Sequence, residues 1–344
     1  MKSLANEVFE ITRHFVNDSS APDDIKVRIH GWIRSRSVSQ LVTAGLYFND
    51  HAWQGRERER FFMQLAAFFK KNTLFTNKDA DHVTLVSFAE DEGQCRRTNA
   101  RLDVHEEQCS EDIKVLVKSA QLYVARVLGD FDRFIEDLPS LLRLTSGATA
   151  TTSRVRSDPK SKLRPPIPVS SRGKHILEAL ASFWGYPEVD FLEMDANRVE
   201  VVPKNYKTGR TIACEPTGSL PFQLAFDAYG KKRLRKKAAI DLSCQRRNQQ
   251  LAWEGSVLRN WATVDMKSAS NTVAFNTVFL LFPYEWADYL RNFRSKHGAL
   301  PDGTVIPYEM FSSMGNGATF VIETLIFAAC CHAVGSRSFS VYGD

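Results

Sequence analysis

Apolar residues recur every three or four positions through the first 142 residues of the chain, as one buried face of a helix requires. The clearest repeat is formed by Phe61, Leu65, Phe68 and Phe69. The charged residues on either side of it, at 56–60 and 70–71, predict a solvated opposite face. We therefore expect residues 1–142 to be mainly helical.

Three later stretches also predict helices. Residues 220–239 have a helical pattern that ends in a dense run of cations. Residues 272–281 are apolar and predict a helix packed under a sheet. Residues 318–334 form the longest apolar run, but this run contains Glu323 and His332 and is short for a bilayer span. We therefore expect it to be a buried helix and predict no membrane segment.

A β-hairpin is predicted in the middle of the chain. Residues 198–202 and 210–214 have strand composition, and the Pro, Asn and Gly between them are turn residues. Lys204, Lys207 and Arg210 lie around this loop. Three cations in one place attract a triphosphate, because arginine binds phosphate as a fork and lysine as a point charge. They are candidates for nucleotide binding.

Two other short apolar stretches end on an acid. Residues 261–266 predict a strand that carries Asp265, and residues 340–342 predict a second strand. Gly343 permits the positive φ of a tight turn, which would place Asp344 at the tip of a hairpin. Two carboxylates on neighbouring strands are the ligands that a pair of Mg²⁺ ions takes. A hairpin turn with an exposed Asp is the alternative explanation of the second stretch.

A glycine-rich loop lies between these two acids in the sequence. Gly315, Asn316 and Gly317 lead directly into the apolar helix predicted at 318–334, and a glycine loop before a helix is a general anion-binding pattern. Thr319 and Glu323 are four positions apart and therefore share one face of that helix.

Composition restricts the class of protein. With 344 residues, 43% of them hydrophobic and 25% charged, the chain is long enough for two or three globular domains. The net charge of +5 is compatible with a polyanionic partner. None of the six cysteines forms a CxxC pair, so we predict no zinc site or disulfide framework and take a reducing cytoplasm as the default.

Two polar segments have more than one explanation. Residues 145–154, with Arg143 and Arg154 near the ends, suit either a flexible linker or a backbone that approaches phosphates. The cations that end the 220–239 helix are favoured near a helix C-terminus, but six exceed what that effect requires. Contact with a nucleic-acid backbone is the alternative. These six residues are Lys231, Lys232, Arg233, Arg235, Lys236 and Lys237.

Taken in order, the motifs resemble those of a known family. The segments at 262–265 and 268–270, then 312–317 with Thr319, Phe320 and Glu323, then 341–344, are similar to motifs A, B and C of RNA-directed RNA polymerases. Residues 202–210 resemble the basic motif F. The chain resembles the replicase beta subunit of the leviviruses, positive-strand RNA bacteriophages of the Qβ type. The likeness is dense from residue 145 to residue 344.

This resemblance implies an α+β, right-hand polymerase fold, with helical fingers, a partial palm that has an antiparallel sheet, and no thumb. The implied regions are a mainly helical N-terminal part of the fingers at 1–165, fingers with the motif F hairpin at 166–250, and a partial palm at 251–344 with motifs A, B and the start of C. Because the family continues past the position of Asp344, we expect this chain to be partial and, by itself, poorly soluble and inactive.

The implied function is RNA-directed RNA polymerisation by a viral replicase catalytic subunit, which adds ribonucleotides to the 3′ end of RNA by two-metal nucleotidyl transfer. Asp265 and Asp344 would be catalytic and would bind two Mg²⁺ ions, with Mn²⁺ as a substitute. Gly315, Asn316 and Gly317 would let the template advance. The implied nucleotide-binding residues are Lys204, Lys207, Arg210, Ser270, Asn271, Thr319 and Glu323.

The resemblance also implies partners and leaves alternatives. The partners are the RNA template and product, ribonucleoside triphosphates, host elongation factors Tu and Ts and a small-subunit ribosomal protein, in the cytoplasm of an infected bacterium. Where the family usually has an aspartate that senses the ribose hydroxyl, this chain has Asn271, which can still hydrogen-bond a hydroxyl. Lys267 replaces a residue that is usually small. The alternatives are a non-catalytic RNA-binding fragment and a reverse transcriptase, which usually has an aromatic residue near this position.

Overall fold

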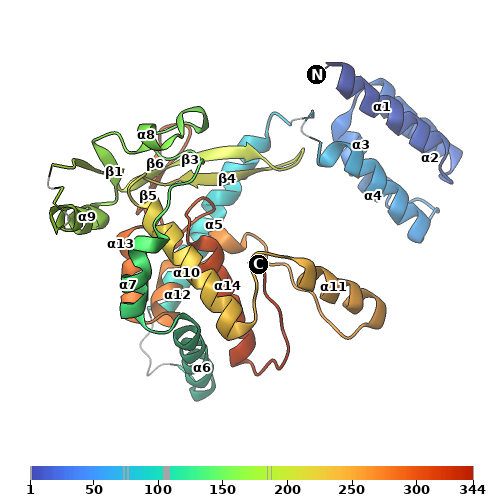
Figure 1. The fold of residues 1–344 in the computed structure, drawn as a ribbon. Coiled ribbons are helices and arrows are strands. Elements are labelled where there is room, and N and C mark those ends of the chain that lie inside the picture. Colours follow the sequence, from blue (N-terminus) through green and yellow to red (C-terminus); the bar gives the residue numbers. More distant parts are fainter. Residues whose placement is uncertain are drawn as a thin grey trace. The chain divides into compact units, whose positions relative to one another are not determined.

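The computed structural model describes residues 2–72, 74–75, 77–103, 109–183, 185–186 and 188–343. The chain forms two compact units, labelled by element in Figure 1. Unit 1 consists of Met1–Ser87 and Val201–Thr211, and unit 2 consists of Phe88–Glu200 and Ile212–Asp344.

Unit 1 is helical, as the apolar repeat predicts. Its helices are α1 (Lys2–Asn17), α2 (Asp23–Arg34), α3 (Val38–Tyr47), α4 (Arg56–Lys70) and the start of α5 (Ala80–Leu102). Phe61, Leu65 and Phe69 of α4 are all buried in a core rich in aromatic rings. The exposed face of α4 carries its charged residues, so the amphipathic pattern of this helix is confirmed.

The predicted β-hairpin is also confirmed, as β3 (Ala196–Pro203) and β4 (Gly209–Cys214). Its tip belongs to unit 1, and hydrogen bonds from its backbone amides attach it there. The Tyr206 amide donates to the Lys70 carbonyl at 2.7 Å, and the Gly209 amide donates to the Thr84 Oγ1 at 2.7 Å.

Unit 2 contains the remaining helices and both small sheets. Its α-helices after α5 are α6 (Glu111–Leu128), α7 (Phe131–Leu141), α8 (Pro159–Lys162), α9 (Ser171–Phe183), α10 (Leu220–Ala238), α11 (Arg246–Leu258), α12 (Phe275–Leu281), α13 (Tyr284–Asn292) and α14 (Thr319–Ala333). Two short 3₁₀ helices are η2 (Arg154–Arg156) and η3 (Ala269–Asn271). The helices predicted at 220–239, 272–281 and 318–334 correspond to α10, α12 and α14.

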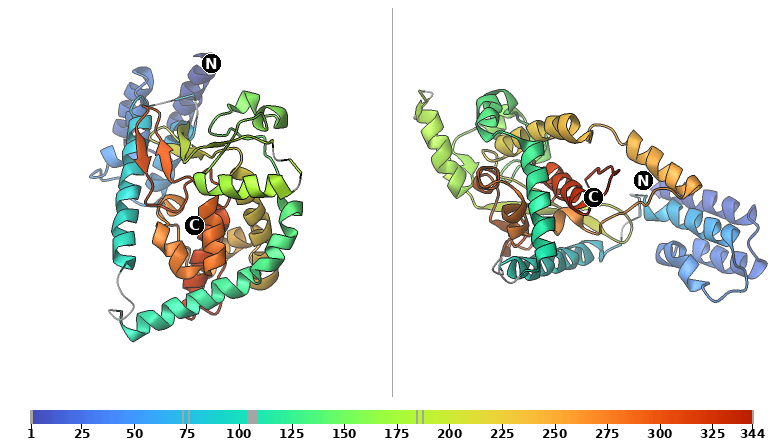
Figure 2. Two further views of the ribbon diagram at one scale, coloured as in Figure 1. Left: turned by 90° about the vertical axis from the view of Figure 1, so that its left-hand side faces the viewer. Right: turned by 90° about the horizontal axis from the view of Figure 1, so that it is seen from below.

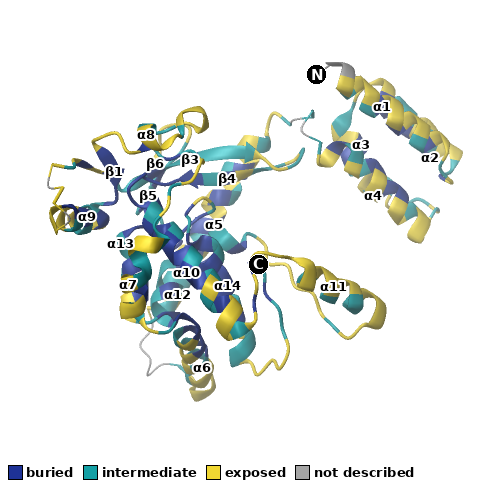
Figure 3. Ribbon diagram, in the orientation of Figure 1, coloured by how far each residue is buried: buried dark blue, intermediate teal, exposed yellow. Residues whose placement is uncertain are grey.

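Helix α14 is the centre of the unit 2 core. It lies beside α6 and α10 in the views of Figures 1 and 2 and contacts both helices. Val321, Leu325 and Ala329 are fully buried. Figure 3 colours the buried parts of α14 dark blue. Gly230 of α10 allows this packing, because a Cβ at that position would overlap Val321. The prediction of a buried helix is therefore confirmed. No described helix is long and apolar enough to cross a bilayer.

The sheets are short and mixed. One sheet has the strand order β4-β3-β5-β6, where β5 is His297–Ala299 and β6 is Val305–Pro307. Strands β5 and β6 pair antiparallel, but β3 and β5 pair parallel, so the expectation of an antiparallel sheet holds for only part of it. The second sheet is a parallel pair of β1 (Ile167–Val169) and β2 (Phe191–Glu193).

Two strand predictions are wrong. Residues 261–266 and 340–342 have no strand structure, and Asp265 lies in an exposed irregular segment. A strand is stable only when a neighbouring strand supplies hydrogen-bonding partners, and the described chain contains no such partner for either stretch. Gly343 does have the expected positive φ, of 76°. Asp344 lies outside the described residues, and the regions assigned at 1–165, 166–250 and 251–344 remain a prediction.

A backbone segment just before the glycine loop is held by two buried charged side chains. Glu92 of α5 accepts hydrogen bonds from the amides of Glu309 at 2.6 Å and Met310 at 3.3 Å. Arg294 donates to the carbonyls of Phe311 at 2.6 Å and Met310 at 2.9 Å. Burial raises the pKa of Glu92 from 4.5 to about 7, although the two amides oppose this increase.

We expect the substitution Glu92→Gln to flatten the pH dependence of stability. A raised pKa means that the folded protein binds the Glu92 proton more tightly than the unfolded chain does, so stability falls as the pH rises from about 4.5 to about 7. Glutamine keeps an acceptor oxygen but does not titrate. The free energy of unfolding should lose on the order of 1–3 kcal/mol less between pH 5 and pH 8 than in the parent chain.

Urea unfolding at the two pH values measures this difference. Glu90→Gln is the matched control, because Glu90 is exposed on the same helix. An unchanged pH dependence in the Glu92 variant would contradict the raised pKa.

Candidate active site

The glycine loop is fixed against the end of strand β4. The Ala213 amide donates to the Met314 carbonyl at 2.7 Å, so the two backbones touch. Gly315 has a φ of 113°, and a Cβ there would overlap the Ala213 carbonyl oxygen. Both observations require glycine at position 315. The loop is therefore close-packed, and its glycines do not imply that it is mobile.

The C-terminal end of the loop is bound to helices α10 and α14. The Gly317 amide donates to the Oε1 of Gln223 in α10 at 2.9 Å. The Asn316 side chain accepts from the Ala318 amide at 2.9 Å, which satisfies a free donor at the start of α14. Thr319 is buried, and its hydroxyl donates to Ser312 Oγ at 2.8 Å. The predicted loop residues thus support each other.

The motif C segment lies against the first two turns of α14. The Gly343 amide donates to the Thr324 hydroxyl at 3.2 Å. The ring of Tyr342 packs edge-on against Phe320, with 5.2 Å between centroids. A Cβ on Gly343 would come within 2.9 Å of a Glu323 carboxylate oxygen. Gly343 and the predicted site residue Glu323 are therefore immediate neighbours.

The motif A segment reaches α14 through η3. Helix η3 contains Ser270 and Asn271 and packs against α14. The side-chain Nδ2 of Asn271 donates to Asp91 of α5 at 3.3 Å, whereas no described residue donates a hydrogen bond to its buried Oδ1 atom. Burial raises the pKa of Asp91, and hydrogen bonds from Asn271 and Ser268 oppose this increase. Asp265, six residues earlier, is exposed.

The three hairpin cations belong to the other unit. Lys204, Lys207 and Arg210 are all exposed at the tip of the β3–β4 hairpin, within unit 1. Their expected role at a triphosphate remains a prediction.

The six cations at the end of α10 divide into two groups. Lys231 pairs with buried Asp227 at 2.8 Å, and Arg233 donates to the Val127 carbonyl of α6 at 2.7 Å, so these two hold the fold together. Lys232, Arg235, Lys236 and Lys237 are exposed, and the spacing of the first three places them on one face of the helix. This face is available to an external anion.

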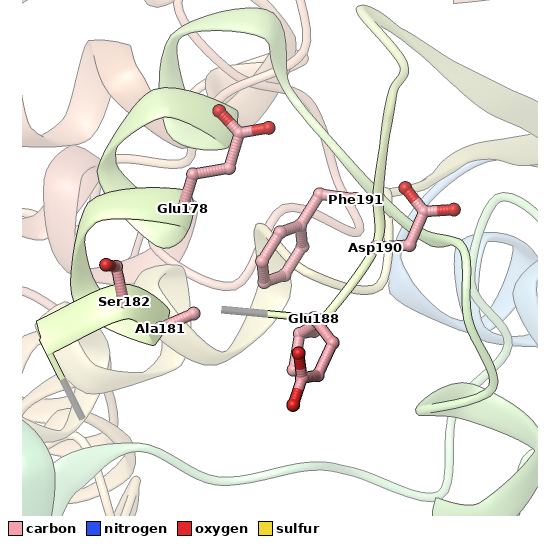
Figure 4. A pocket seen from close by; sticks show the side chains of 7 residues that line it. Glu178, Ala181, Ser182, Glu188, Asp190 and Phe191 are labelled. Carbon is pink, nitrogen blue, oxygen red and sulfur yellow. The ribbon is translucent and has the colours of Figure 1, made fainter. Parts of the chain in front are cut away.

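A separate pocket of unit 2 does not suit a nucleotide. It has a volume of about 510 Å³ and lies between α9 and β2 (Figure 4). Glu178, Glu188 and Asp190 line it together with Phe191, and its described lining includes no cation. Three carboxylates repel a phosphate group. The nucleotide site is therefore expected elsewhere.

Sequence reasoning did not find several of the supporting residues. Thr324 is a polar residue within an apolar run, which is a detectable signal. Asp91 and Gln223 have no such signal, because their partners are many positions away in the chain.

Comparison with known proteins defines the class. The family model for RNA replicase, beta-chain, matches residues 59–344, which is most of the chain. This chain belongs to the RNA replicase beta-chain family.

The relatives are bacteriophage proteins, as the motif resemblance indicated. The RNA-directed RNA polymerase subunit beta of Enterobacteria phage SP is 36% identical over 281 residues, which cover 77% of this chain and 48% of that protein. The corresponding subunit of Escherichia virus Qbeta is 37% identical over 280 residues, covering 77% and 46%. The beta chain of Escherichia phage MS2 is 38% identical over 160 residues, covering 45% and 29%. The chain spans about half the length of the first two relatives.

We expect Gly315→Ala to destabilise unit 2 by more than strained φ alone explains. The new methyl group would meet the Ala213 carbonyl oxygen, which is backbone and cannot rotate away. Gly303→Ala is the control, because Gly303 has a φ of 88° and open space around it. The control should cost about 1–2 kcal/mol, and the Gly315 variant about 1–3 kcal/mol more. Equal costs in urea unfolding would show that the loop can move away from β4.

Proposed function

We propose that this chain carries the nucleotidyl-transfer site of a viral RNA-directed RNA polymerase, which adds ribonucleotides to the 3′ end of RNA during viral genome replication. The observation that carries the proposal is the convergence of three segments on α14. These segments are η3, the glycine loop and the segment that ends at Gly343. The names of the phage relatives support the same activity.

In this reaction the 3′-hydroxyl oxygen of RNA forms a bond to the α-phosphorus of a ribonucleoside triphosphate. The bond between that phosphorus and the oxygen that bridges it to the β-phosphorus breaks, pyrophosphate leaves, and the hydroxyl proton passes to water. Asp265 and Asp344 would hold two Mg²⁺ ions, or Mn²⁺ in their place. Such ions lower the pKa of the attacking hydroxyl and neutralise charge on the pyrophosphate.

The chemistry of Asp265 fits this role. Its carboxylate is exposed, and it offers the hard oxygen ligands that Mg²⁺ takes. The described residues contain no cluster of three or more His, Cys, Asp or Glu side chains arranged for a metal. One or two carboxylates together with substrate phosphates are a common Mg²⁺ ligand set, so a sparse protein contribution is compatible with the ion.

The ribose and the nascent base pair would lie along η3 and α14. The Oδ1 atom of Asn271 is an acceptor that no described residue uses. Because this atom is buried, the side chain would have to turn before a ribose hydroxyl could donate to it. Ser270 is half-buried beside Asn271, and Glu323 lies next to Gly343. Thr319, the first residue of α14, would lie at the base of this site. Gly315, Asn316 and Gly317 would guide the template strand.

Two groups of cations would bind different phosphates. Lys204, Lys207 and Arg210 would bind the triphosphate, because three exposed cations surround one short loop. The exposed face of α10 with Lys232, Arg235 and Lys236 would bind the RNA backbone. Host elongation factors Tu and Ts, a ribosomal protein and the cytoplasm of the infected bacterium complete the proposal, and the motif resemblance alone supports them.

We expect Asp265→Asn to abolish RNA synthesis and to leave RNA binding within about twofold. The amide is similar in shape but cannot supply the negative charge that the metal needs. Primer-independent incorporation of labelled nucleotides on an RNA template, with Mg²⁺ or Mn²⁺, measures the loss. The assay uses this chain and the same chain extended to the length of its relatives.

Asp302→Asn, in an exposed turn, is the matched control. Substantial synthesis by the Asp265 variant would remove Asp265 from the mechanism. RNA binding without synthesis by either parent chain would favour the non-catalytic alternative, and use of deoxyribonucleotides would favour a reverse transcriptase.

Replacing the two cation groups should affect different measured quantities, the KM for nucleotides in one case and the affinity for RNA in the other. Single Lys204→Ala, Lys207→Ala or Arg210→Ala changes should each raise the KM for nucleotides by the equivalent of roughly 1.5–3 kcal/mol, with little change in RNA affinity. Replacing Lys232, Arg235 and Lys236 together with Gln should weaken RNA binding and reduce the slope of log affinity against log salt by roughly 2–3.

Each set of variants is the control for the other. Nucleotide titrations and RNA-binding titrations at several salt concentrations separate the two effects. If the hairpin variants weaken RNA binding at an unchanged KM, the hairpin contacts RNA instead of the triphosphate.

A further inference from the structure

A carboxylate that the proposed reaction does not use is buried next to the glycine loop. Glu215 follows β4 and is only 3% exposed. Its Oε1 accepts from the side-chain Nδ2 of Asn197 at 3.0 Å. Its Oε2 accepts from Ser295 Oγ at 2.8 Å and from Gln223 Nε2 at 3.1 Å. Burial raises the pKa of Glu215, while these bonds and the charge of Arg294 oppose the increase. Because all three neighbours donate, the arrangement accommodates the ionised form.

Gln223 connects this carboxylate to the loop. Its side chain is 2% exposed and lies in α10. Its Nε2 donates to Glu215 and also to the Phe293 carbonyl at 2.7 Å, while its Oε1 accepts from the Gly317 amide at 2.9 Å. The NH₂ group of the Gln223 side chain therefore meets two acceptors, and the carbonyl oxygen of that side chain meets a donor.

The orientation of this amide decides whether the loop is held. If the Gln223 amide turned over, its NH₂ group would face the Gly317 N–H, and its oxygen would face the Glu215 carboxylate and the Phe293 carbonyl. Both contacts would be repulsive in a buried site, where an unsatisfied polar group costs about 1–3 kcal/mol. A carboxylate can only accept hydrogen bonds, so Glu215 selects the orientation that offers an acceptor to Gly317.

We infer that Glu215 is a positioning residue, which acts through the Gln223 amide to fix the Gly315, Asn316 and Gly317 loop against α10. Gly317 has no side chain of its own, so this bond and the close packing of its Cα on Gln223 and Leu224 hold it in place. The end of β4 and the loop are coupled a second time by the bond from the Ala213 amide to the Met314 carbonyl. The catalytic importance of this coupling rests on the proposed polymerase function.

Hydrogen exchange at the Gly317 amide tests the coupling without any catalytic assay. Overlapping peptides that cover residues 312–318 report this exchange, and peptides from the core of α6 report global stability. Glu215→Gln introduces an NH₂ group among three donors, and Gln223→Met removes the acceptor but keeps a similar length. Both should reduce the protection of Gly317 at least tenfold relative to α6.

Ser295→Ala is the matched control. It removes another hydrogen bond from the same carboxylate oxygen but leaves the Gln223 to Gly317 contact intact, so the relative protection of Gly317 should stay within twofold. Equal losses of protection at Gly317 and in α6 for Glu215→Gln would overturn the inference, because they indicate general destabilisation. A loss for Gln223→Met alone would also overturn it, because Glu215 would then not act through Gln223.

Nucleotide incorporation measures the consequence for the reaction, in the chain extended to the length of its relatives. Glu215→Gln should lower kcat at least tenfold and change the KM for nucleotides and the affinity for RNA by less than threefold, whereas Ser295→Ala should retain kcat. An unchanged kcat despite faster Gly317 exchange would show that the coupling is structural only and would overturn the positioning role. Failure of the proposed function is recognised separately, by the Asp265→Asn result, and leaves the exchange result valid.

Discussion

The burial of one guanidinium group determines how the segments around the candidate site are held. Arg294 is 6% exposed and lies beside the stacked rings of Phe275 and Phe311, with its guanidinium carbon at 5.1 and 5.5 Å from their centroids. Burial lowers its pKa to about 10, although the negative charges of Glu215 and Glu92 oppose this decrease. A buried charge is tolerated only when its hydrogen bonds are made. The backbone at 310–311, which supplies those bonds, is therefore restrained.

The requirement that buried polar groups make their hydrogen bonds also applies to the side chains between Arg294 and the glycine loop. Glu92 binds the amides on the other side of the 309–311 segment, and Glu215 with Gln223 binds the amide of Gly317. The 309–311 segment and the C-terminal end of the loop are thus each attached to buried polar groups that have few alternative partners. Buried networks of this kind specify one arrangement, because any rearrangement leaves a donor or an acceptor unsatisfied.

Exposed and buried charges have different tasks in unit 2. Lys231 and Arg233 are used within the fold, and Lys232 and Lys236 on the same helix face solvent. Similarly, Glu215 is buried in a structural network, whereas Asp265 is exposed and free to meet a ligand. The groups proposed to bind substrates are therefore those whose removal should cost the fold least.

The sequence by itself determined the local elements and the family. Three local features depend only on residues that are close in the sequence: the repeat at Phe61, Leu65 and Phe69, the turn of the β3–β4 hairpin and the apolar run of α14. The order of the polymerase motifs can likewise be read directly from the sequence. The tertiary structure decided which distant residues meet. Asp91 and Asn271 are 180 positions apart, and Gln223 and Gly317 are 94 apart. It also decided that residues 261–266 form no strand, because a strand depends on a partner that local composition cannot supply.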